Sequence, residues 1–339
     1  MNGGGVVGYP LGLFASLALT AHGGPLLQLP TANHALFEPG AEERFFVGTV
    51  GRGWESGTFG CVRTGGQQFH EGLDIRPLNR DRRGEATDPV LASADGTVAY
   101  VNRRAGLSNY GIYVVLRHPV DGLEVFTLYA HLREARADLA PGTAVRGGET
   151  IGILGRSANT REGIGKDRAH VHFEINLLLN DRYAEWHQRH LPGQRNDHGH
   201  WHGRNLLGLD PRAVFLAQRE QGARFRLVQF IRQQPELCRV QVRATDFPWL
   251  RRYAPLVLPN PRAEREGLAG YELGLNFVGL PVRVIPRAEA ELRSPAPVQL
   301  VGVNPDEAAR QPCQSLVHRD GERWRLTRSG EQLISLLTW

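Results

Sequence analysis

Two histidines stand one residue apart in the stretch RAHVHFEI, which covers residues 168–175. Apolar and polar residues alternate along it, and a period of two predicts a β-strand that is buried on one face only. His170 and His172 then point the same way and lie about 6–7 Å apart. That separation suits two side chains of one site but is awkward for equivalent ligation of a single ion. The spacing therefore indicates one metal ligand and one neighbouring histidine.

Upstream, the stretch FHEGLDI places His70 and Asp74 four residues apart with Gly72 between them. Glycine disfavours a helix, so we expect this pair at a strand end and its loop. His70, Asp74 and His172 together offer two nitrogens and one oxygen, a donor set that suits Zn²⁺. Three protein ligands leave a fourth position for water, as in hydrolytic zinc sites.

A further histidine, His131, closes a predicted strand in the stretch YAHL. A single histidine on a strand is more often a structural residue than a functional one. An HxxxD pair, a histidine at a strand end and an HxH pair, in this order within one β-rich region, form a much stronger joint signal. His118, which precedes the Asp121-Gly122 turn, is expected to be structural.

The region that must position these residues is rich in β signals and lacks a long amphipathic helix. DPVLASADGTVAYV predicts two strands joined by a turn at Asp95-Gly96, and GIYVVLRHPVDGLEVFTLYAHL predicts two more around Asp121-Gly122. PGTAVRGGETIGILG adds turns marked by glycine. We therefore expect a mainly β fold built on an antiparallel sheet.

These motifs, in this order, resemble the lysostaphin/LytM-type zinc metallopeptidases that cut peptide cross-links of bacterial peptidoglycan. The resemblance covers roughly half of the chain. Its segments are SGTFGCVR, FHEGLDI, ADGTV, NYGIYVVLRH, LYAHL, GTAVRGGETIGILG, HVHFEI and the LDP at residues 209–211.

By position, the resemblance implies that His70, Asp74 and His172 are the zinc ligands and that one Zn²⁺ binds per chain. It implies that His131 and His170 are catalytic histidines that do not bind the metal. One of them would act as general base while the other stabilises the oxyanion or protonates the leaving amine. Peptidoglycan peptides would be the substrate, and the peptidase unit would have the antiparallel LytM fold, which resembles a duplicated hybrid motif.

Three features near these motifs allow two interpretations each. Glu174 shares a strand face with the histidines and could orient an imidazole or form a structural salt bridge. The residues Arg161, Lys166 and Arg168 could hold substrate carboxylates or lie in a solvated loop. The insertion 181–204, with His198, His200 and His202, is expected to be an exposed polar loop rather than a second metal site, because no carboxylate or cysteine completes a ligand set.

Functions of other classes fit less well. A lipoyl or biotinyl carrier needs a lysine at a turn tip, and Lys166, the only lysine, is not in such a setting. A phosphotransfer carrier has no use for the carboxylate of an HxxxD pair, and GIGKD lacks the frame of a phosphate-binding loop. A non-catalytic LytM-type module that binds the wall or activates an amidase remains the alternative. Such modules typically lose ligands, whereas all five positions are filled here.

Composition supports a soluble protein with sizeable cores: 339 residues, of which 41% are hydrophobic and 22% charged. The formal net charge of +5 comes almost wholly from arginine, whose fork suits carboxylates and phosphates. Because this charge is spread along the chain without a basic run, we expect no nucleic-acid partner.

The apolar run 6–21 predicts export to the cell envelope, in the periplasm or beyond. It is short and broken by glycine, so no stable membrane span is expected. Cys61, Cys238 and Cys313 show no metal-binding spacing. Cys238 and Cys313 could pair in an oxidising compartment and leave Cys61 buried, or all three could be free.

We expect three parts along the chain. Residues 1–45 form the leader and lead-in, residues 46–216 form the peptidase domain, and residues 225–339 form a smaller β-rich accessory domain. The stretch AQREQGAR would separate the last two. Strands are predicted in RFRLVQFI, CRVQVRATDF, GLPVRVIPRAEAEL and PVQLVGV of the accessory domain, and no motif there indicates chemistry.

Overall fold

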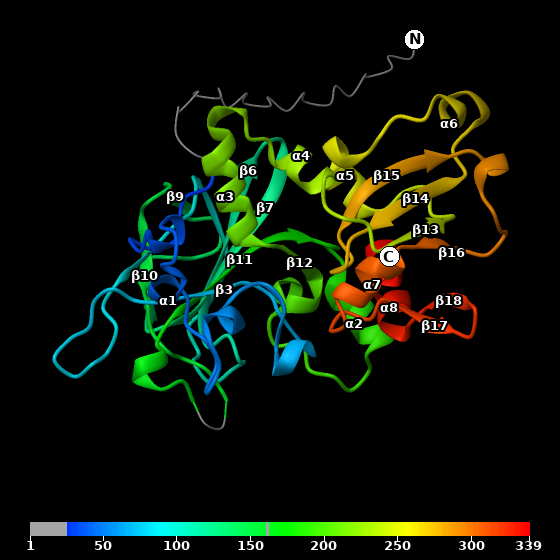
Figure 1. Cartoon of the computed structure of the whole chain (residues 1–339). Helices are drawn as coiled ribbons and strands as arrows, with labels where there is room; N and C mark the ends of the chain where they lie inside the picture. Colours follow the sequence, from blue (N-terminus) through cyan, green and yellow to red (C-terminus); the bar gives the residue numbers. More distant parts are fainter. Residues whose placement is uncertain (1–25, 161–162) are drawn as a thin grey trace, which may run out of the picture.

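The computed structural model of the chain describes residues 26–160 and 163–339 (Figure 1). The apolar run 6–21 and Arg161 lie outside the described residues, and so do the predictions that rest on them. In the described part, strands pair in antiparallel sheets, and the predicted mainly β fold is confirmed. None of the helices within these two ranges is long and apolar enough to cross a membrane.

A seven-stranded sheet forms the centre of the molecule, with the strand order β12-β11-β7-β6-β5-β9 and with β3 paired to the free part of β11. Each of these pairings is antiparallel. The strands are β3 (Leu73–Ile75), β5 (Gly96–Asn102), β6 (Ile112–Val120), β7 (Leu123–Leu132), β9 (Ala144–Val145), β11 (Val171–Leu178) and β12 (Leu206–Leu209).

The hairpin β6–β7 confirms the turn predicted at Asp121-Gly122. Both turn residues have positive φ, 51° and 77°. This is the conformation of the tight two-residue turns whose twist matches that of paired strands. The register pairs Val120 with Leu123 across the turn.

The two strands predicted on either side of Asp95-Gly96 are present with a bend between them, but they pair with other strands and not with each other. Strand β4 (Pro89–Leu91) pairs with β10 (Thr150–Ile153) in a small sheet of order β4-β10-β8, which also contains β8 (Glu134–Ala135). Strand β5 pairs with β6 and β9 instead. A Cβ atom at Gly96 would lie 2.3 Å from the carbonyl oxygen of Arg117, so the glycine permits a close approach to β6.

Both faces of the central sheet are covered, although the alternation around the HxH pair predicted a strand buried on one face. Every residue of β11 is buried. One face belongs to the main hydrophobic cluster, and the other packs on a smaller cluster that includes Tyr113, Phe126 and Leu128, with Trp201 against it. The polar side chains of β11 therefore lie in the protein interior.

The insertion 181–204 supplies part of that second cover, so its prediction as an exposed polar loop is wrong. It contains helix α2 (Tyr183–His190), in which Tyr183 and Trp186 are fully buried as part of the main cluster. Farther along, the Trp201 ring packs 5.3 Å from that of Phe126. Aromatic residues spaced among polar ones give the segment enough apolar surface to fold onto the sheet.

The C-terminal region has a four-stranded antiparallel sheet of order β15-β14-β13-β16, which stands beside the central sheet in Figure 1. Its strands are β13 (Cys238–Val242), β14 (Gly270–Leu275), β15 (Pro281–Arg287) and β16 (Val298–Val303). A hairpin of β17 (Val317–Asp320) and β18 (Arg323–Leu326) follows. Further elements are α4 (Leu227–Arg232), α5 (Pro248–Arg252), α6 (Pro261–Glu266), α7 (Pro305–Arg310) and α8 (Arg328–Leu337).

The strand predicted just after residue 223 is wrong. RFRLVQFI holds α4 rather than a strand, because Leu227 and Ile231, four residues apart, are both buried on one helix face. The first five residues of AQREQGAR end helix α3 (Pro211–Gln221), which Asp210 caps by accepting from the backbone N–H of Arg212. One hydrophobic cluster runs from Leu27 to Leu337. The domain boundaries stay a prediction.

Three elements near the N-terminus complete the fold: α1 (Glu42–Phe45), β1 (Gly60–Arg63) and β2 (Gln68–His70). Strands β1 and β2 form a separate two-stranded sheet in which Gly60 pairs with His70 and Cys61 with Phe69. Strand β1 therefore lies beside the strand that carries the first candidate ligand.

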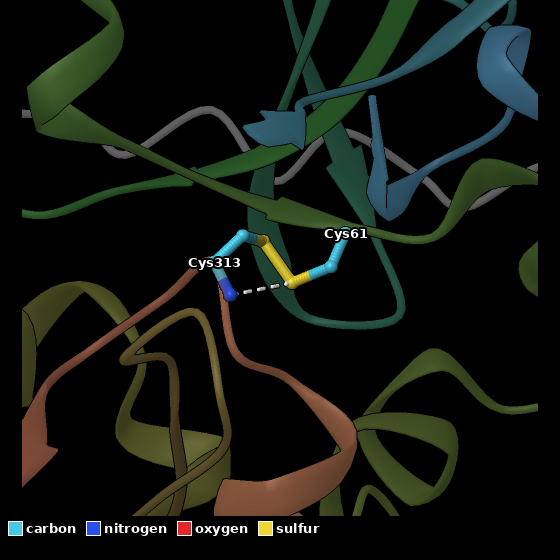
Figure 2. Close-up of a disulfide and its surroundings, with 2 residues drawn as sticks. All are labelled: Cys61 and Cys313. Carbon is cyan, nitrogen blue, oxygen red and sulfur yellow. Dashed lines mark hydrogen bonds between the residues drawn. A yellow bond between two sulfur atoms is a disulfide. The ribbon is translucent and has the colours of Figure 1, made fainter. Parts of the chain in front are cut away.

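A disulfide joins Cys61 of β1 to Cys313, which follows α7, across a sequence separation of 252 residues (Figure 2). The pairing considered from sequence, Cys238 with Cys313, is wrong. Cys238 is a free, buried residue at the start of β13. Sequence separation is a poor guide here because β1 approaches the C-terminal region only through the tertiary fold.

The disulfide leads to a prediction on stability. Replacing Cys313 by serine should lower the free energy of unfolding by about 2–4 kcal/mol, because the unfolded chain loses a constraint over a long loop. Denaturant unfolding followed by fluorescence measures the change. Cys238→Ala, which leaves the disulfide intact, is the control for loss of a cysteine. Mass spectrometry of an unreduced digest should recover the peptides of Cys61 and Cys313 joined, and a different pairing would contradict the structure.

Candidate metal and catalytic site

The strand pairing of β3 with β11 places two candidate ligands opposite each other. Asp74 on β3 is the registered partner of His172 on β11. The link from β2 to β3 must cross β11 very closely, because a Cβ atom at Gly72 would lie 2.2 Å from the carbonyl oxygen of Phe173. A glycine at this position lets the chain turn back over the strand, and His70 then faces the same pair.

The ligand atoms of His70, Asp74 and His172 converge on one point. The Nε2 of His70 lies 3.1 Å from the Asp74 Oδ1 and 3.0 Å from the Nδ1 of His172. The Nδ1 of His172 is 3.0 Å from the same oxygen. All three side chains are buried, and within the described residues no other group of three or more such side chains is close enough to hold a metal ion.

The surroundings of the two imidazoles fit metal ligation. The Nδ1 of His70 lies 2.7 Å from the carbonyl oxygen of Thr58, and the Nε2 of His172 lies 2.9 Å from Glu174 Oε1. Metal-binding histidines usually donate their second N–H to a carbonyl or carboxylate, which fixes the tautomer and the ring. The site therefore suits a borderline divalent ion such as Zn²⁺. Two roles were considered for Glu174, and its contact with the His172 ring agrees with the role of orienting an imidazole.

The charges of this cluster are strongly coupled. Burial alone would raise the pKa of the Asp74 carboxyl, but the neighbouring His70 and His170 rings and hydrogen bonds to the imidazoles hold that pKa well below its usual range. Burial would lower the pKa of His172, yet the hydrogen bonds to Asp74 and Glu174 raise it to about 10. The cluster is thus built to hold positive charge between two carboxylates.

Arg63 is a site residue that the sequence reasoning did not single out, although it ends the quoted motif SGTFGCVR. Its Nη2 donates to Asp74 Oδ2 at 2.6 Å, while its Nε donates to the carbonyl oxygen of Ser56. Arginine thereby occupies one oxygen of the carboxylate and leaves the other, Oδ1, facing the histidines. The contact orients Asp74.

His131 and His170 lie at the edge of the cluster, where the Nε2 of His170 is 3.4 Å from Asp74 Oδ1. Their rings are 4.8 Å apart and nearly perpendicular, and the His131 ring is 5.9 Å from that of His172. The Nδ1 of His131 is 2.9 Å from the carbonyl oxygen of Ser157, and that of His170 is 2.6 Å from the carbonyl oxygen of Arg168. With Nδ1 protonated as the donor, each Nε2 keeps its lone pair.

Burial lowers the pKa of both His131 and His170, in His131 together with the repulsion of the neighbouring imidazoles. Both rings are therefore neutral at pH 7 and able to accept a proton. His131 also has a left-handed backbone conformation, with φ of 60°. Such a conformation is strained for a residue other than glycine and occurs often at functional sites.

Other histidines have structural contacts. His118 is buried between the carbonyl oxygen of Asp95, 3.0 Å from its Nδ1, and Thr127 Oγ1, 2.7 Å from its Nε2, as the structural role requires. His198 is also buried, with its Nδ1 3.0 Å from the hydroxyl of Tyr100.

Of the basic residues before the HxH pair, Lys166 and Arg168 are held by the protein itself. The Nζ of Lys166 donates to the carbonyl oxygen of Arg83 and lies 3.4 Å from Glu85 Oε1. The Nε of Arg168 donates to the carbonyl oxygen of Gly48. These contacts hold the loop against its neighbours, so Lys166 and Arg168 do not lie in a freely solvated loop.

Residues 68–184 match the profile described as Peptidase family M23. Over 89 residues the chain is 42% identical to the DD-carboxypeptidase/endopeptidase Mpg of Neisseria meningitidis, and over 107 residues it is 32% identical to a lipoprotein NlpD/LppB homolog of Pseudomonas aeruginosa. The first match covers 26% of this chain and 17% of the Neisseria protein, and the second covers 32% and 29%. The chain thus spans less than a third of either relative.

Two solved structures are also similar. The catalytic domain of the antimicrobial peptidase lysostaphin from Staphylococcus simulans is 19% identical, with a TM-score of 0.28, and the match covers 48% of this chain and 90% of that one. A zinc-containing peptidase from Vibrio cholerae is 23% identical, with a TM-score of 0.27, and the match covers 40% of this chain and 37% of that one.

The contact of Glu174 with His172 leads to a prediction on metal affinity. Glu174→Gln should weaken Zn²⁺ binding to metal-free protein by about 10–100-fold, because the imidazole loses the carboxylate that orients it and raises its basicity. Calorimetric titration with Zn²⁺ measures the change. Glu134→Gln, an exposed carboxylate of β8, is the matched control and should bind Zn²⁺ as the unchanged protein does. An unaltered affinity in Glu174→Gln would show that the contact does not support ligation.

Proposed function

Because residues 68–184 of this chain form a domain of Peptidase family M23, we propose that the protein is a zinc-dependent peptidase that hydrolyses peptide bonds in peptidoglycan. The observation that carries the proposal is the convergence of His70, Asp74 and His172 on one point, with His131 and His170 beside it. Three buried ligands and two neutral histidines supply what a hydrolytic zinc site needs.

We propose that one Zn²⁺ per chain is held by the Nε2 of His70, the Oδ1 of Asp74 and the Nδ1 of His172. When bound, the ion would lower the pKa of a water molecule and polarise the carbonyl group of the scissile bond. Arg63 keeps Asp74 turned so that Oδ1 faces the site, and Glu174 holds the ring of His172.

The two remaining histidines move protons. Each has its Nδ1 fixed by a backbone carbonyl, so its Nε2 is available to take a proton during attack and to return it to the leaving amine. The one that does not act as base is placed to donate a hydrogen bond to the oxyanion. Their ring centres are 4.8 Å apart, so both histidines are near enough to act on one substrate.

The substrate proposal rests on the family and on the named relatives. The Neisseria relative is named a DD-carboxypeptidase/endopeptidase, and a Haemophilus influenzae relative, 39% identical over 89 residues, is named an uncharacterized metalloprotease. We infer that stem peptides or their cross-links are cleaved, and that residues 46–216 form the peptidase unit with residues 225–339 as an accessory region.

The second candidate is a non-catalytic module that binds the wall or activates an amidase. The similarity to the NlpD/LppB homolog supports it. The filled ligand positions favour the enzyme, because a binding module has no need of three buried ligands and two histidines kept neutral beside them.

We also propose that the protein works in the cell envelope. A disulfide between Cys61 and Cys313 is suited to an oxidising compartment, and one relative is named a lipoprotein. Fractionation of cells that produce the full chain should place it outside the cytosol with the apolar run removed or embedded. A cytosolic product with reduced Cys61 and Cys313 would overturn this part.

Alanine variants separate the enzyme from the binding module. His131→Ala and His170→Ala should keep near-normal zinc content and folding, yet release soluble muropeptides from purified peptidoglycan about 10²–10⁴-fold more slowly. His172→Ala should lose both zinc and activity. His118→Gln, a buried histidine away from the site, controls for loss of an imidazole. Zinc is measured by elemental analysis and release by mass spectrometry.

Two results would contradict the proposal. Unchanged function in all variants, with no muropeptide release by the original protein, would favour the binding module. Equal zinc loss from His170→Ala and His172→Ala would show that both histidines of the HxH pair are ligands.

A further inference from the structure

The C-terminal sheet carries a cationic cavity that has no part in the proposed peptidase reaction. Its volume is about 530 Å³, and four arginines from different segments of the chain line it. Arg232 comes from α4, Arg239 from β13, Arg283 from β15 and Arg293 from the segment before β16. The lining also includes the carboxylates Glu236 and Glu272. Four guanidinium groups against two carboxylates leave an excess of two positive charges.

The strand register explains why the sheet is hollow here. Arg283 pairs with Gly274, Gly274 pairs with Arg239, and Arg239 pairs with Gly302, so one row across four strands alternates arginine and glycine. A Cβ atom at Gly302 would meet no atom within 4 Å, so this position is open. Gly302 thus leaves a floor without a side chain beside Arg239, whereas the space over Gly274 is taken by the carboxylate of Glu236.

Glu236 organises the arginines without using all their donors. Its carboxylate lies over Gly274 and pairs with the Nε of Arg239 and, at 2.9 Å, with the Nε of Arg283. The terminal nitrogens of these two arginines have no hydrogen-bond acceptor within residues 26–160 and 163–339. Both arginine side chains are nearly half exposed, at 47% and 45%. Their outer donors therefore face solvent in a fixed arrangement, which is the form in which arginine binds carboxylates.

The size of the row indicates the kind of ligand. Three spacings between neighbouring strands, each about 4.8 Å, make the row about 14 Å long. An extended peptide of about four residues has this length, at about 3.4 Å per residue. A single inorganic anion would fill only a small part of it. The charge excess matches two carboxylates.

We propose that this cavity, floored by Gly302 and lined by Arg239, Arg283 and Arg293, is a binding site for a short acidic peptide segment that carries two carboxylates. The site is separate from the metal cluster and does not depend on the proposed hydrolysis. The peptide would lie across the four strands. Its carboxylates would take the free terminal nitrogens of the arginines, while Glu236 holds those arginines in place.

The full chain can be tested by calorimetry with two probes, end-blocked Glu-Gly-Gly-Glu and its neutral counterpart Gln-Gly-Gly-Gln. The acidic probe should bind and the neutral one should not, and the affinity should fall as salt is added. Arg239→Gln combined with Arg283→Gln should weaken binding of the acidic probe by about tenfold or more, since charged hydrogen bonds are lost. Arg251→Gln combined with Arg262→Gln removes the same charge outside the cavity and should leave binding unchanged.

Glu236→Gln should change the affinity for the acidic probe in the opposite direction. This variant keeps the proposal testable if the double arginine variant does not fold. Glutamine removes the negative charge but keeps an oxygen that can accept from an arginine Nε, so the acidic probe should bind severalfold more tightly. Equal binding of both probes, or binding of neither, would overturn the proposal and leave the arginines as a structural ion-pair network. If inorganic phosphate displaces the acidic probe and binds as tightly as the probe does, the cavity is a simple anion site. This result would overturn the peptide assignment.

Discussion

The pairing of β11 with two different strands is the constraint on which the site depends. At His172 the strand has Asp74 of β3 on one side and Ala130 of β7 on the other. The first pairing brings a carboxylate to the imidazole, and the second brings the end of β7, where His131 stands. A shift of one residue in either register would turn these side chains to the opposite face of the sheet. The hydrophobic alternation of β11 fixes that register, so the core and the site are specified together.

The burial of charge around β11 follows from the same arrangement. His172 lies between Asp74 and Glu174, and Asn176 donates to the other oxygen of Glu174. Buried charges are tolerated only when they are paired and hydrogen-bonded. The cover provided by the insertion 181–204 keeps water from part of this face, and Arg63 closes the network on the outer oxygen of Asp74. The site is thus a buried polar network whose members are held from several elements.

Local patterns predicted the parts of this structure that depend on local physics. The alternation in HVHFEI predicted a strand, and Asp121-Gly122 predicted the turn, because both follow from backbone conformation and from the spacing of side chains. Most of what failed depended on contacts between distant parts of the chain, and one failure was a wrong choice of period. Gly96 looked like a turn residue but serves a close approach to Arg117, and the alternation in RFRLVQFI concealed a helix with Leu227 and Ile231 on one face. The partner of Cys61, and the contact of Arg63 with Asp74, need the tertiary fold.

The disulfide limits how the chain can be cut into separate fragments. Cys61 lies on the strand beside His70, and its partner stands in the last thirty residues of the chain, so the two regions called peptidase and accessory share a covalent bond as well as a core (Figure 2). A fragment cut near residue 224 would carry an unpaired thiol two residues from Arg63 and would expose the faces of Phe59 and Phe69 that pack on Phe277. The region after residue 224 is therefore not a detachable module. Recombination of this peptidase with other C-terminal regions would have to supply a new partner for that strand.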